Sequence, residues 1–321
     1  MNDFTAENND FESIVGKAPE VNEDSPKNLT RAGVIGAGTM GQGIAQLLAS
    51  SGIDVILVDK NEETLKKSMS ELTESMDREI ARWAMTASEK RAVLSRIRPT
   101  TDFDDLDGMK LIIEAVPEVL ELKQELFQHL DGLCDGEAIL VSNTSTLSLS
   151  EIASVTEHPE NVIGLHFMNP VTRTKIVEVI RGLRTSEETF KYAKGLAERI
   201  NKVVVDVYEY PGYVTTRVII PMLNEAMYVL MEKVASAEGI DTAMKLGFNL
   251  NFGPLEFADM MGLDEVMKWM ETLFHELGDL KYRPCPLLRK MVRANHHGKK
   301  TGEGFYRYDE NGRKIGQSHM I

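Results

Sequence analysis

The sequence predicts a protein of the α/β class, in which an N-terminal doubly wound sheet is followed by an all-helical domain. Up to about residue 210, apolar runs of strand length alternate with segments of helical periodicity, which is typical of α/β sheets. Beyond Pro211-Gly212 the periodicity is helical and convincing strands are lacking. Since 321 residues are enough for two domains of ordinary size, we expect domains at 31–210 and 211–321.

The charge and cysteine content argue against several classes of protein. The chain has 36 Lys and Arg against 50 Asp and Glu, a formal net charge of −14. Nucleic-acid binding depends on basic side chains that neutralise phosphates, so we expect no nucleic-acid partner. No apolar run approaches the roughly 20 residues that span a bilayer, and we expect no membrane partner. Cys134 and Cys285 lack the spacing of a zinc site or disulfide framework, which predicts no metal and a reducing compartment.

The first 30 residues differ from the rest of the chain. They contain seven acidic residues and two lysines, without sustained apolar periodicity, and we expect a mobile acidic tail over 1–30. Neither the basic start and apolar core of a secretory signal nor the Arg-rich composition of a mitochondrial presequence is present. A cytoplasmic location is the simplest expectation.

The first regular elements form a β-α-β unit around a glycine-rich turn. An apolar strand at 31–35 leads into the turn at 36–41, and helical periodicity follows. Gly36 permits a tight turn, Gly38 lets the backbone approach a pyrophosphate, and Gly41 allows close packing of helix on strand. The second strand, 53–58, ends at Asp59, where a carboxylate binds the adenosine ribose hydroxyls and repels a 2′-phosphate. The unit therefore predicts a Rossmann-type domain that binds NAD rather than NADP.

The elements after this unit continue the alternation. A helical excursion at 62–98 is too long for one ordinary crossover helix and predicts two helices. Further strands are expected at 110–116, 138–142, 162–166, 175–180 and 202–207.

A histidine and a glutamate stand out in two of these strands. His166 lies at the end of an apolar strand, before a turn-forming Asn-Pro, and Glu178 interrupts a run that is otherwise apolar enough to be buried. A buried carboxylate needs a partner, and a nearby imidazole would supply one. In an alcohol dehydrogenase without metal, the histidine would remove the hydroxyl proton, while the carboxylate fixes its tautomer and stabilises the imidazolium.

Seven segments in order resemble the L-3-hydroxyacyl-CoA dehydrogenases, including the bacterial 3-hydroxybutyryl-CoA dehydrogenases. The resemblance covers about Arg31 to Tyr308, and the order of the segments is more specific than any one of them. The segments are Gly36-Ala37-Gly38-Thr39-Met40-Gly41-Gln42-Gly43-Ile44-Ala45, Glu114-Ala115-Val116-Pro117-Glu118, Ser142-Asn143-Thr144-Ser145, Gly164 to Pro170, Val177-Glu178-Val179, Asp241-Thr242-Ala243-Met244-Lys245-Leu246-Gly247, and Gly298-Lys299-Lys300-Thr301-Gly302-Glu303-Gly304-Phe305-Tyr306.

The resemblance implies roles for these residues in the oxidation of an L-3-hydroxyacyl-CoA to a 3-oxoacyl-CoA. His166 would be the general base in oxidation and the general acid in reduction, Glu178 its orienting partner, and Ser145 a hydrogen-bond donor to the reacting oxygen. The implied cofactor contacts are Gly36, Gly38, Thr39, Met40, Gly41, Asp59, Glu118, Lys123, Asn143, Ser145, Asn169 and Lys300. The implied contacts of the coenzyme A substrate are Ser75, Arg82 and Ser145.

One position departs from the family pattern. The family usually reads Pro-Gly-Phe-x-x-Asn-Arg after the Pro-Gly hinge, with the Asn close to the reacting end of the substrate. Here the stretch is Pro211-Gly212-Tyr213-Val214-Thr215-Thr216-Arg217, so Thr216 replaces the amide. A threonine hydroxyl is shorter and donates only one hydrogen bond. Ordinary turnover with Thr216 compensating, an altered acyl substrate and weakened catalysis are all open outcomes of this exchange. Our hypothesis is a working dehydrogenase with a shifted substrate preference.

Two other readings stay open on the sequence. One is a dehydrogenase of a free hydroxy acid such as gulonate or carnitine. The other is a non-catalytic NAD-binding protein. By the resemblance, the C-terminal helices form the interface of a homodimer, and the Met-rich helical segments here suit that role.

Overall fold

The computed structural model describes residues 25–318, so the predicted acidic tail lies outside the described residues up to residue 24. Residues 25–30, which the sequence places in that tail, belong to the folded part. The short 3-10 helix η2 (Pro26–Asn28) precedes Leu29, which is 7% exposed. The guanidinium of Arg199 donates hydrogen bonds to the carbonyls of Pro26 (2.6 Å) and Leu29 (2.7 Å). The predicted tail therefore runs too far.

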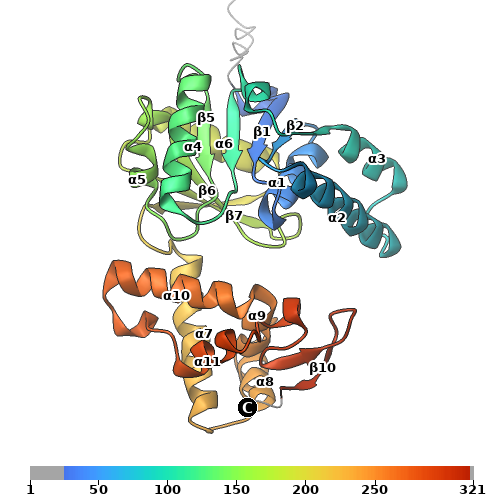
Figure 1. Cartoon of the computed structure of the whole chain (residues 1–321), viewed down its shortest axis with the longest axis vertical. Helices are drawn as coiled ribbons and strands as arrows, with labels where there is room; N and C mark the ends of the chain where they lie inside the picture. The colour runs from blue at the N-terminus through green and yellow to red at the C-terminus, as the bar shows by residue number, and fades with distance from the viewer. Residues whose placement is uncertain (1–24, 319–321) are drawn as a thin grey trace, which may run out of the picture.

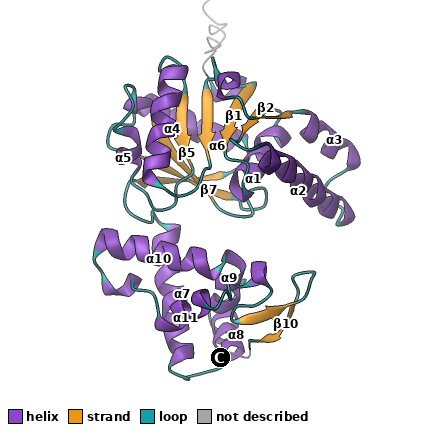
Figure 2. Ribbon diagram, in the orientation of Figure 1, coloured by secondary structure: helices purple, strands orange, loops and turns teal. Residues whose placement is uncertain are grey.

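The N-terminal part is built on one eight-stranded sheet (Figure 2). Its order, β3-β2-β1-β4-β5-β6-β7-β8, begins with the strand order of dinucleotide-binding folds. The strands are β1 (Arg31–Ile35), β2 (Asp54–Val58), β3 (Ile97–Thr100), β4 (Leu111–Glu114), β5 (Ile139–Ser142), β6 (Val162–Phe167), β7 (Ile176–Arg181) and β8 (Val203–Tyr208). Every pair is parallel except β6 with β7. The connection between these two strands is too short for a crossover helix, which forces the antiparallel pairing.

Helices cover both faces of the sheet (Figure 1). They are α1 (Thr39–Ser50), α2 (Glu62–Ala81), α3 (Ala87–Ser95), α4 (Leu120–Leu133), α5 (Leu149–Ala153) and α6 (Glu187–Arg199). Apolar side chains of α1, α2, α3 and α6 share one buried cluster with the sheet, while those of α4 and α5 share another. The predicted doubly wound arrangement is confirmed.

The helical excursion at 62–98 is confirmed as two helices, but its predicted end is wrong. Ile97 and Arg98 belong to β3, which pairs with β2. This strand has the sequence Ile-Arg-Pro-Thr, of which Ile97 alone is buried, so it carries no alternation that a pattern would reveal. The side chains of Asn61 and Thr86 are the N-caps of α2 and α3, and each accepts at least one hydrogen bond from a backbone N–H group in the first turn of its helix.

The C-terminal part has its own apolar core. Its helices are α7 (Thr215–Met231), α8 (Ala237–Gly247), α9 (Pro254–Met261), α10 (Leu263–Leu277) and α11 (Pro286–Arg293). The expectation of an all-helical domain needs one correction, since β9 (Tyr306–Tyr308) and β10 (Lys314–Gln317) form an antiparallel hairpin. The hairpin is anchored by phenols, as Tyr306 and Tyr308 donate hydrogen bonds to the buried carboxylates of Asp241 and Asp259. The remaining short 3-10 helices are η3 (Phe103–Leu106), η4 (Pro159–Asn161), η5 (Leu280–Tyr282) and η6 (Lys299–Thr301).

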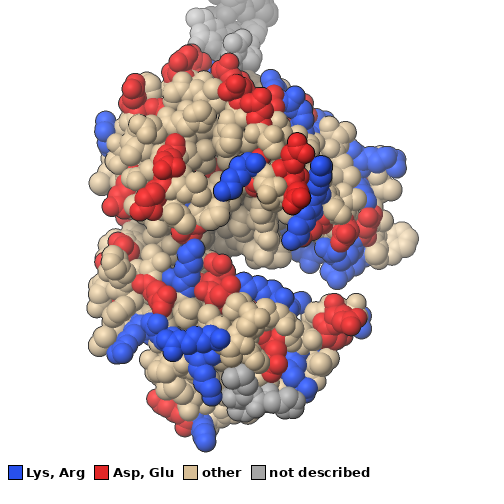
Figure 3. Space-filling model, viewed as in Figure 1, with Lys and Arg blue, Asp and Glu red and all other residues tan. Residues whose placement is uncertain are grey.

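The space-filling view shows a hollow between the two parts (Figure 3). Basic side chains lie on both sides of it in this view. Within residues 25–318, no helix is both long enough and apolar enough to cross a membrane.

Candidate active site

The glycine turn between β1 and α1 has the geometry that a dinucleotide requires. Gly36 has φ +96°, and a Cβ there would lie 2.6 Å from the carbonyl oxygen of Ala115. A Cβ on Gly41 would lie 1.7 Å from the carbonyl oxygen of Gly36, so α1 approaches the turn as closely as glycine permits. A Cβ on Gly38, in contrast, would meet nothing within 4 Å. The second glycine therefore leaves open space beside the start of α1, where a pyrophosphate would approach.

Residues around this turn fit the adenosine half of NAD. The carboxylate of Asp59 follows β2, and its Oδ2 accepts a hydrogen bond from the N–H of Ala37 (2.9 Å). Helix α1 begins after Gly38 without a side-chain cap, which leaves its first N–H groups available to phosphate oxygens. Thr39 is exposed and Met40 is half-buried in that first turn. The donor set and the open space at Gly38 both match the cofactor.

A buried ion-pair cluster lies at the end of β4. The ammonium of Lys123 is paired with the carboxylates of Glu114 and Glu118, and the hydroxyl of Ser142 donates to Glu114 (2.7 Å). Burial raises the pKa of Glu114, and the Lys123 charge offsets this only in part. Lys123, predicted as a cofactor contact, is 1% exposed. Glu114 was not singled out from the sequence as a site residue, although it interrupts an apolar strand just as Glu178 does.

Glu118 holds the loop that carries Ser145. Its Oε1 accepts hydrogen bonds from the Thr144 hydroxyl (2.6 Å) and from the N–H groups of Ser145 (2.8 Å) and Thr146 (2.9 Å). Burial alone would raise the pKa of Glu118, but the Lys123 charge and these donors outweigh it and lower the pKa. The side chain of Asn143 accepts a hydrogen bond from the N–H of Phe167 (2.9 Å). The loop after β5 is thereby tied to the end of β6.

The predicted pair His166 and Glu178 is formed. The two residues are direct partners in the antiparallel register of β6 and β7, which places their side chains on the same face of the sheet. Nδ1 of His166 lies 2.7 Å from Oε2 of Glu178, and the residues are 4% and 0% exposed. Burial would raise the pKa of Glu178, but the hydrogen bond and charge of His166, together with donors from Thr215, lower it.

Residues at the start of the C-terminal part also contact the His166–Glu178 pair. The sequence did not predict these contacts. Oε1 of Glu178 accepts hydrogen bonds from the N–H groups of Val214 (3.1 Å) and Thr215 (2.8 Å). The Thr215 hydroxyl donates to Oε2 (2.9 Å). The ring of Tyr213 packs against the ring of His166, with centroids 5.6 Å apart and planes inclined by 54°. The Pro-Gly hinge marked this segment in the sequence, but only the tertiary structure shows what it contacts.

The other predicted residues lie on several elements. Thr216 is 2% exposed, in the first turn of α7, and Asn169 is exposed just after β6. Lys300, in the C-terminal part, forms an ion pair with Asp264 (2.6 Å). On α2 and at its end, Ser75 is half-buried and Arg82 is exposed. Contacts of Ser75, Arg82 or Lys300 with the His166 pair are absent from the part of the chain that the structure describes.

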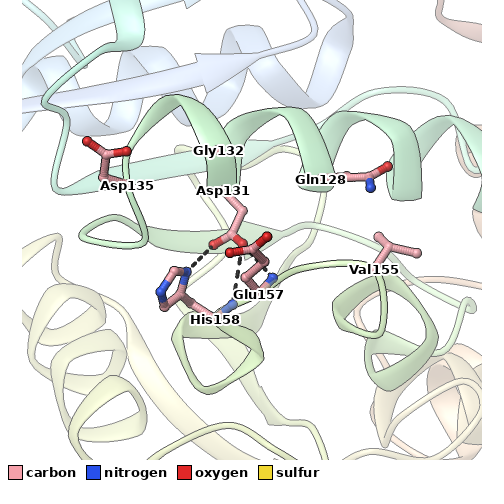
Figure 4. Close-up of a pocket in the computed structure, with 7 residues that line it drawn as sticks. All are labelled: Gln128, Asp131, Gly132, Asp135, Val155, Glu157 and His158. Carbon is pink, nitrogen blue, oxygen red and sulfur yellow. Dashed lines mark hydrogen bonds and ion pairs between the residues drawn. The ribbon is translucent and has the colours of Figure 1, made fainter.

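A separate polar pocket lies at the opposite, amino-terminal edge of the strands (Figure 4). There the carboxylate of Asp131 accepts hydrogen bonds from the backbone of Glu157 (2.6 Å) and contacts the ring of His158 (3.2 Å). These contacts tie the end of α4 to the loop before β6. The described residues contain no cluster of His, Cys, Asp and Glu that fits a metal ion. Cys134 and Cys285 are free and buried.

Comparison with known proteins agrees with this geometry. Residues 31–210 match the family described as 3-hydroxyacyl-CoA dehydrogenase, NAD binding domain, and residues 212–308 match the C-terminal domain of the same enzyme. The chain is 47% identical to a probable 3-hydroxybutyryl-CoA dehydrogenase of Bacillus subtilis over 86% of its own length and 96% of the relative's. It is also 47% identical to a 3-hydroxybutyryl-CoA dehydrogenase of Clostridioides difficile, over 86% and 99% of the two chains.

A solved structure agrees as well. The crystal structure of (S)-3-hydroxybutyryl-CoA dehydrogenase from Ralstonia eutropha superposes with a TM-score of 0.81 at 42% identity, covering 88% of this chain and all (100%) of the other. With both family domains matched and relatives of this similarity, the chain belongs to the 3-hydroxyacyl-CoA dehydrogenase family.

Proposed function

We propose that this chain, an NAD-dependent 3-hydroxyacyl-CoA dehydrogenase by family, uses His166 and Glu178 to oxidise an L-3-hydroxyacyl-CoA reversibly to the 3-oxoacyl-CoA. The observation that carries the proposal is the buried pair itself, 2.7 Å apart, beside the loops that follow β4 and β5. The relatives named 3-hydroxybutyryl-CoA dehydrogenases support a short acyl group as the first substrate to test.

The pair is arranged for proton transfer at a single nitrogen. Nδ1 of His166 donates to the Glu178 carboxylate, which leaves the lone pair of Nε2 for the proton of the substrate hydroxyl. The lowered pKa of Glu178 keeps its negative charge in place to stabilise the imidazolium that forms. In the reverse direction the same nitrogen returns the proton. Ser145, on the loop that Glu118 holds, is proposed to donate a hydrogen bond to the reacting oxygen.

The proposed cofactor contacts divide into two groups. The turn residues Gly36, Gly38, Thr39, Met40 and Gly41 and the carboxylate of Asp59 would hold the adenosine and pyrophosphate, with Asp59 favouring NAD over NADP. Bound NAD supplies a hydride acceptor or donor at its nicotinamide ring. The proposed contacts on that side are Glu118, Lys123, Asn143, Ser145, Asn169 and Lys300.

The coenzyme A part of the substrate is proposed to lie against α2. Arg82 is exposed at the end of this helix, where its guanidinium is free to bind phosphate oxygens in a bidentate manner. Ser75, two turns earlier on the same helix, is the second proposed contact.

The direct test is the loss of NADH absorbance on addition of acetoacetyl-CoA. The parent protein should consume NADH, and His166→Ala should bind NADH without consuming it. An inactive parent that still binds NADH would contradict the proposal and favour a free hydroxy acid or a non-catalytic role.

We also propose a cytoplasmic location and a domain boundary at Pro211.

A further proposal is a homodimer that forms through the C-terminal helices. It is supported by large apolar side chains that are exposed on the C-terminal part, including Leu246 (80%), Phe248 (71%) and Val218 (70%), because an interface would remove them from water. The Met-rich segments contribute less, since Met270 is fully buried in the core and Met260 is 57% exposed. Analytical ultracentrifugation should give a particle mass twice that of one chain, which is 35.9 kDa. A monomer at micromolar concentration would contradict the dimer.

A further inference from the structure

The first turn of α7 takes part in the His166–Glu178 pair through a side chain as well as through its backbone. The N–H groups of Val214 and Thr215 both donate to Oε1 of Glu178, a capping contact that any residue other than proline supplies at these positions. The Thr215 hydroxyl is different, because it donates to Oε2 at 2.9 Å. That oxygen is the one that lies 2.7 Å from Nδ1 of His166.

Two donors on one carboxylate oxygen have two consequences. Together with the two N–H donors to Oε1, the Thr215 hydroxyl restricts the rotation of the carboxylate, and with it the direction along which Oε2 meets the imidazole. It also takes up part of the negative charge of that oxygen, since hydrogen bonds to an ionised acceptor are strong. The side chain of the preceding residue, Val214, has no hydrogen-bond donor, so this residue contributes only its N–H group.

The surroundings contain few other groups that could set the same charge. On β8, the residue paired with Glu178 is Val205, which is apolar. On the hinge, the buried phenol of Tyr213 experiences the charges of Glu118, Glu209, Glu178 and Glu114. The described donors to Glu178 are therefore His166, Val214 and Thr215, of which Thr215 alone offers a replaceable neutral side chain.

We infer that Thr215 is a positioning residue, whose hydroxyl orients Glu178 and thereby links the His166–Glu178 pair of the sheet to the first turn of the C-terminal part. This inference rests on the proposed function, since it assumes that His166 transfers the proton. Thr215 itself is not placed in contact with the substrate. Its position is one that the family pattern Pro-Gly-Phe-x-x-Asn-Arg leaves unspecified.

The test compares Thr215→Val, which keeps the shape and removes the hydroxyl, with Thr215→Ser, which keeps the hydroxyl. For Thr215→Val we expect kcat to fall roughly tenfold with KM nearly unchanged, the effect of losing one hydrogen bond to a charged group. More of the Glu178 charge then acts on the imidazolium, so the acid limb of the kcat/KM profile for oxidation should move to higher pH. Thr215→Ser should stay within about threefold of the parent and keep its pH profile.

A matched control is Thr156→Val, which removes a half-buried hydroxyl that donates to the carbonyl of Ala153 (2.9 Å) in the loop before β6. It should leave kcat and the pH profile unchanged.

The outcomes separate this inference from the proposed function. A parent that shows no His166-dependent turnover overturns the proposed function and this inference with it. An active parent with an unchanged Thr215→Val variant overturns the inference alone. It is also overturned if Thr215→Ser is as impaired as Thr215→Val, because the lost property would then be packing rather than the hydroxyl.

Discussion

Nδ1 of His166 lies 2.7 Å from Oε2 of Glu178 because the two residues face each other across the one antiparallel junction of the main sheet. Antiparallel pairing brings the end of β6 beside the beginning of β7, so both residues lie at the edge that carries the glycine turn and the Ser145 loop. A parallel β7 would have placed Glu178 at the opposite edge. The short connection between these strands is thus a condition for forming the pair.

The first prediction concerns the charge of Glu178. Glu178→Gln keeps the size of the side chain but cannot stabilise an imidazolium, so kcat for reduction of acetoacetyl-CoA should fall on the order of a hundredfold or more. The dissociation constant of NADH, measured by fluorescence titration, should change little, because Glu178 is not a proposed cofactor contact. A kcat within threefold of the parent would show that the carboxylate has no electrostatic role.

The second prediction uses two glycines of the same turn. Gly38→Ala places a methyl group where no atom lies within 4 Å, at φ −72°, which alanine adopts freely. Its unfolding free energy should stay within about 1 kcal/mol of the parent, while the Kd of NADH rises at least roughly tenfold. In Gly41→Ala the new Cβ would lie 1.7 Å from the Gly36 carbonyl oxygen, and we expect a loss of about 1–3 kcal/mol in stability.

Urea unfolding and NADH titration of both variants check this contrast. Unchanged NADH binding in Gly38→Ala would mean that the open space beside α1 is not the pyrophosphate site. A Gly41→Ala variant as stable as the parent would mean that α1 can move away from the turn at little cost.

The third prediction concerns pH and the C-terminal core. Asp259 is 1% exposed and accepts hydrogen bonds from the N–H groups of Phe305 (2.9 Å) and Tyr306 (2.8 Å) and from the phenol of Tyr308 (3.1 Å). Burial raises its pKa from 3.8 to about 7, although the backbone donors offset part of the effect. Between pH ~4 and ~7 the folded chain therefore holds a proton that the unfolded chain has released.

The raised pKa of Asp259 determines the direction in which stability changes with pH. Because protonation of Asp259 favours the folded chain between pH ~4 and ~7, its stabilising contribution to Tm should decrease as the pH rises to about 7 and then level off. Calorimetry of the parent and of Asp259→Asn between pH 5 and 8.5 compares the slopes of Tm against pH. The variant should be less stable overall but should lack this part of the slope. Identical slopes in the two proteins would contradict the prediction.

The local parts of the site could be predicted from the sequence because each carries its own pattern. The glycine spacing, Asp59 at a strand end and Glu178 within an apolar run are visible within about ten residues. Glu114 offers the same signal as Glu178, because it also interrupts an apolar strand, but its buried partner Lys123 lies on another element and is visible only in the structure. Strand β3 was missed because Ile97 is its only fully buried residue.

The long-range parts could not be predicted in this way. The register that pairs His166 with Glu178, and the reach of Thr215 to a carboxylate 37 residues earlier, depend on how separate elements pack. Periodicity reports which face of one element is buried, but not which residue of another element it meets. The family resemblance pointed to His166 and Glu178 as partners, yet it contained no information on Thr215.

The last prediction concerns Thr216, where the family has an asparagine. Thr216 is 2% exposed in the first turn of α7, directly after the residue that binds Glu178. Its hydroxyl donates one hydrogen bond, whereas an amide donates two and reaches further. Thr216→Asn should therefore change the ratio of kcat/KM between acetoacetyl-CoA and longer 3-oxoacyl-CoAs by about fivefold, equivalent to roughly 1 kcal/mol. Thr216→Val serves as the control, since it separates loss of the hydroxyl from the added bulk. If Thr216→Asn leaves kcat/KM unchanged across the whole panel, this position does not set the substrate preference.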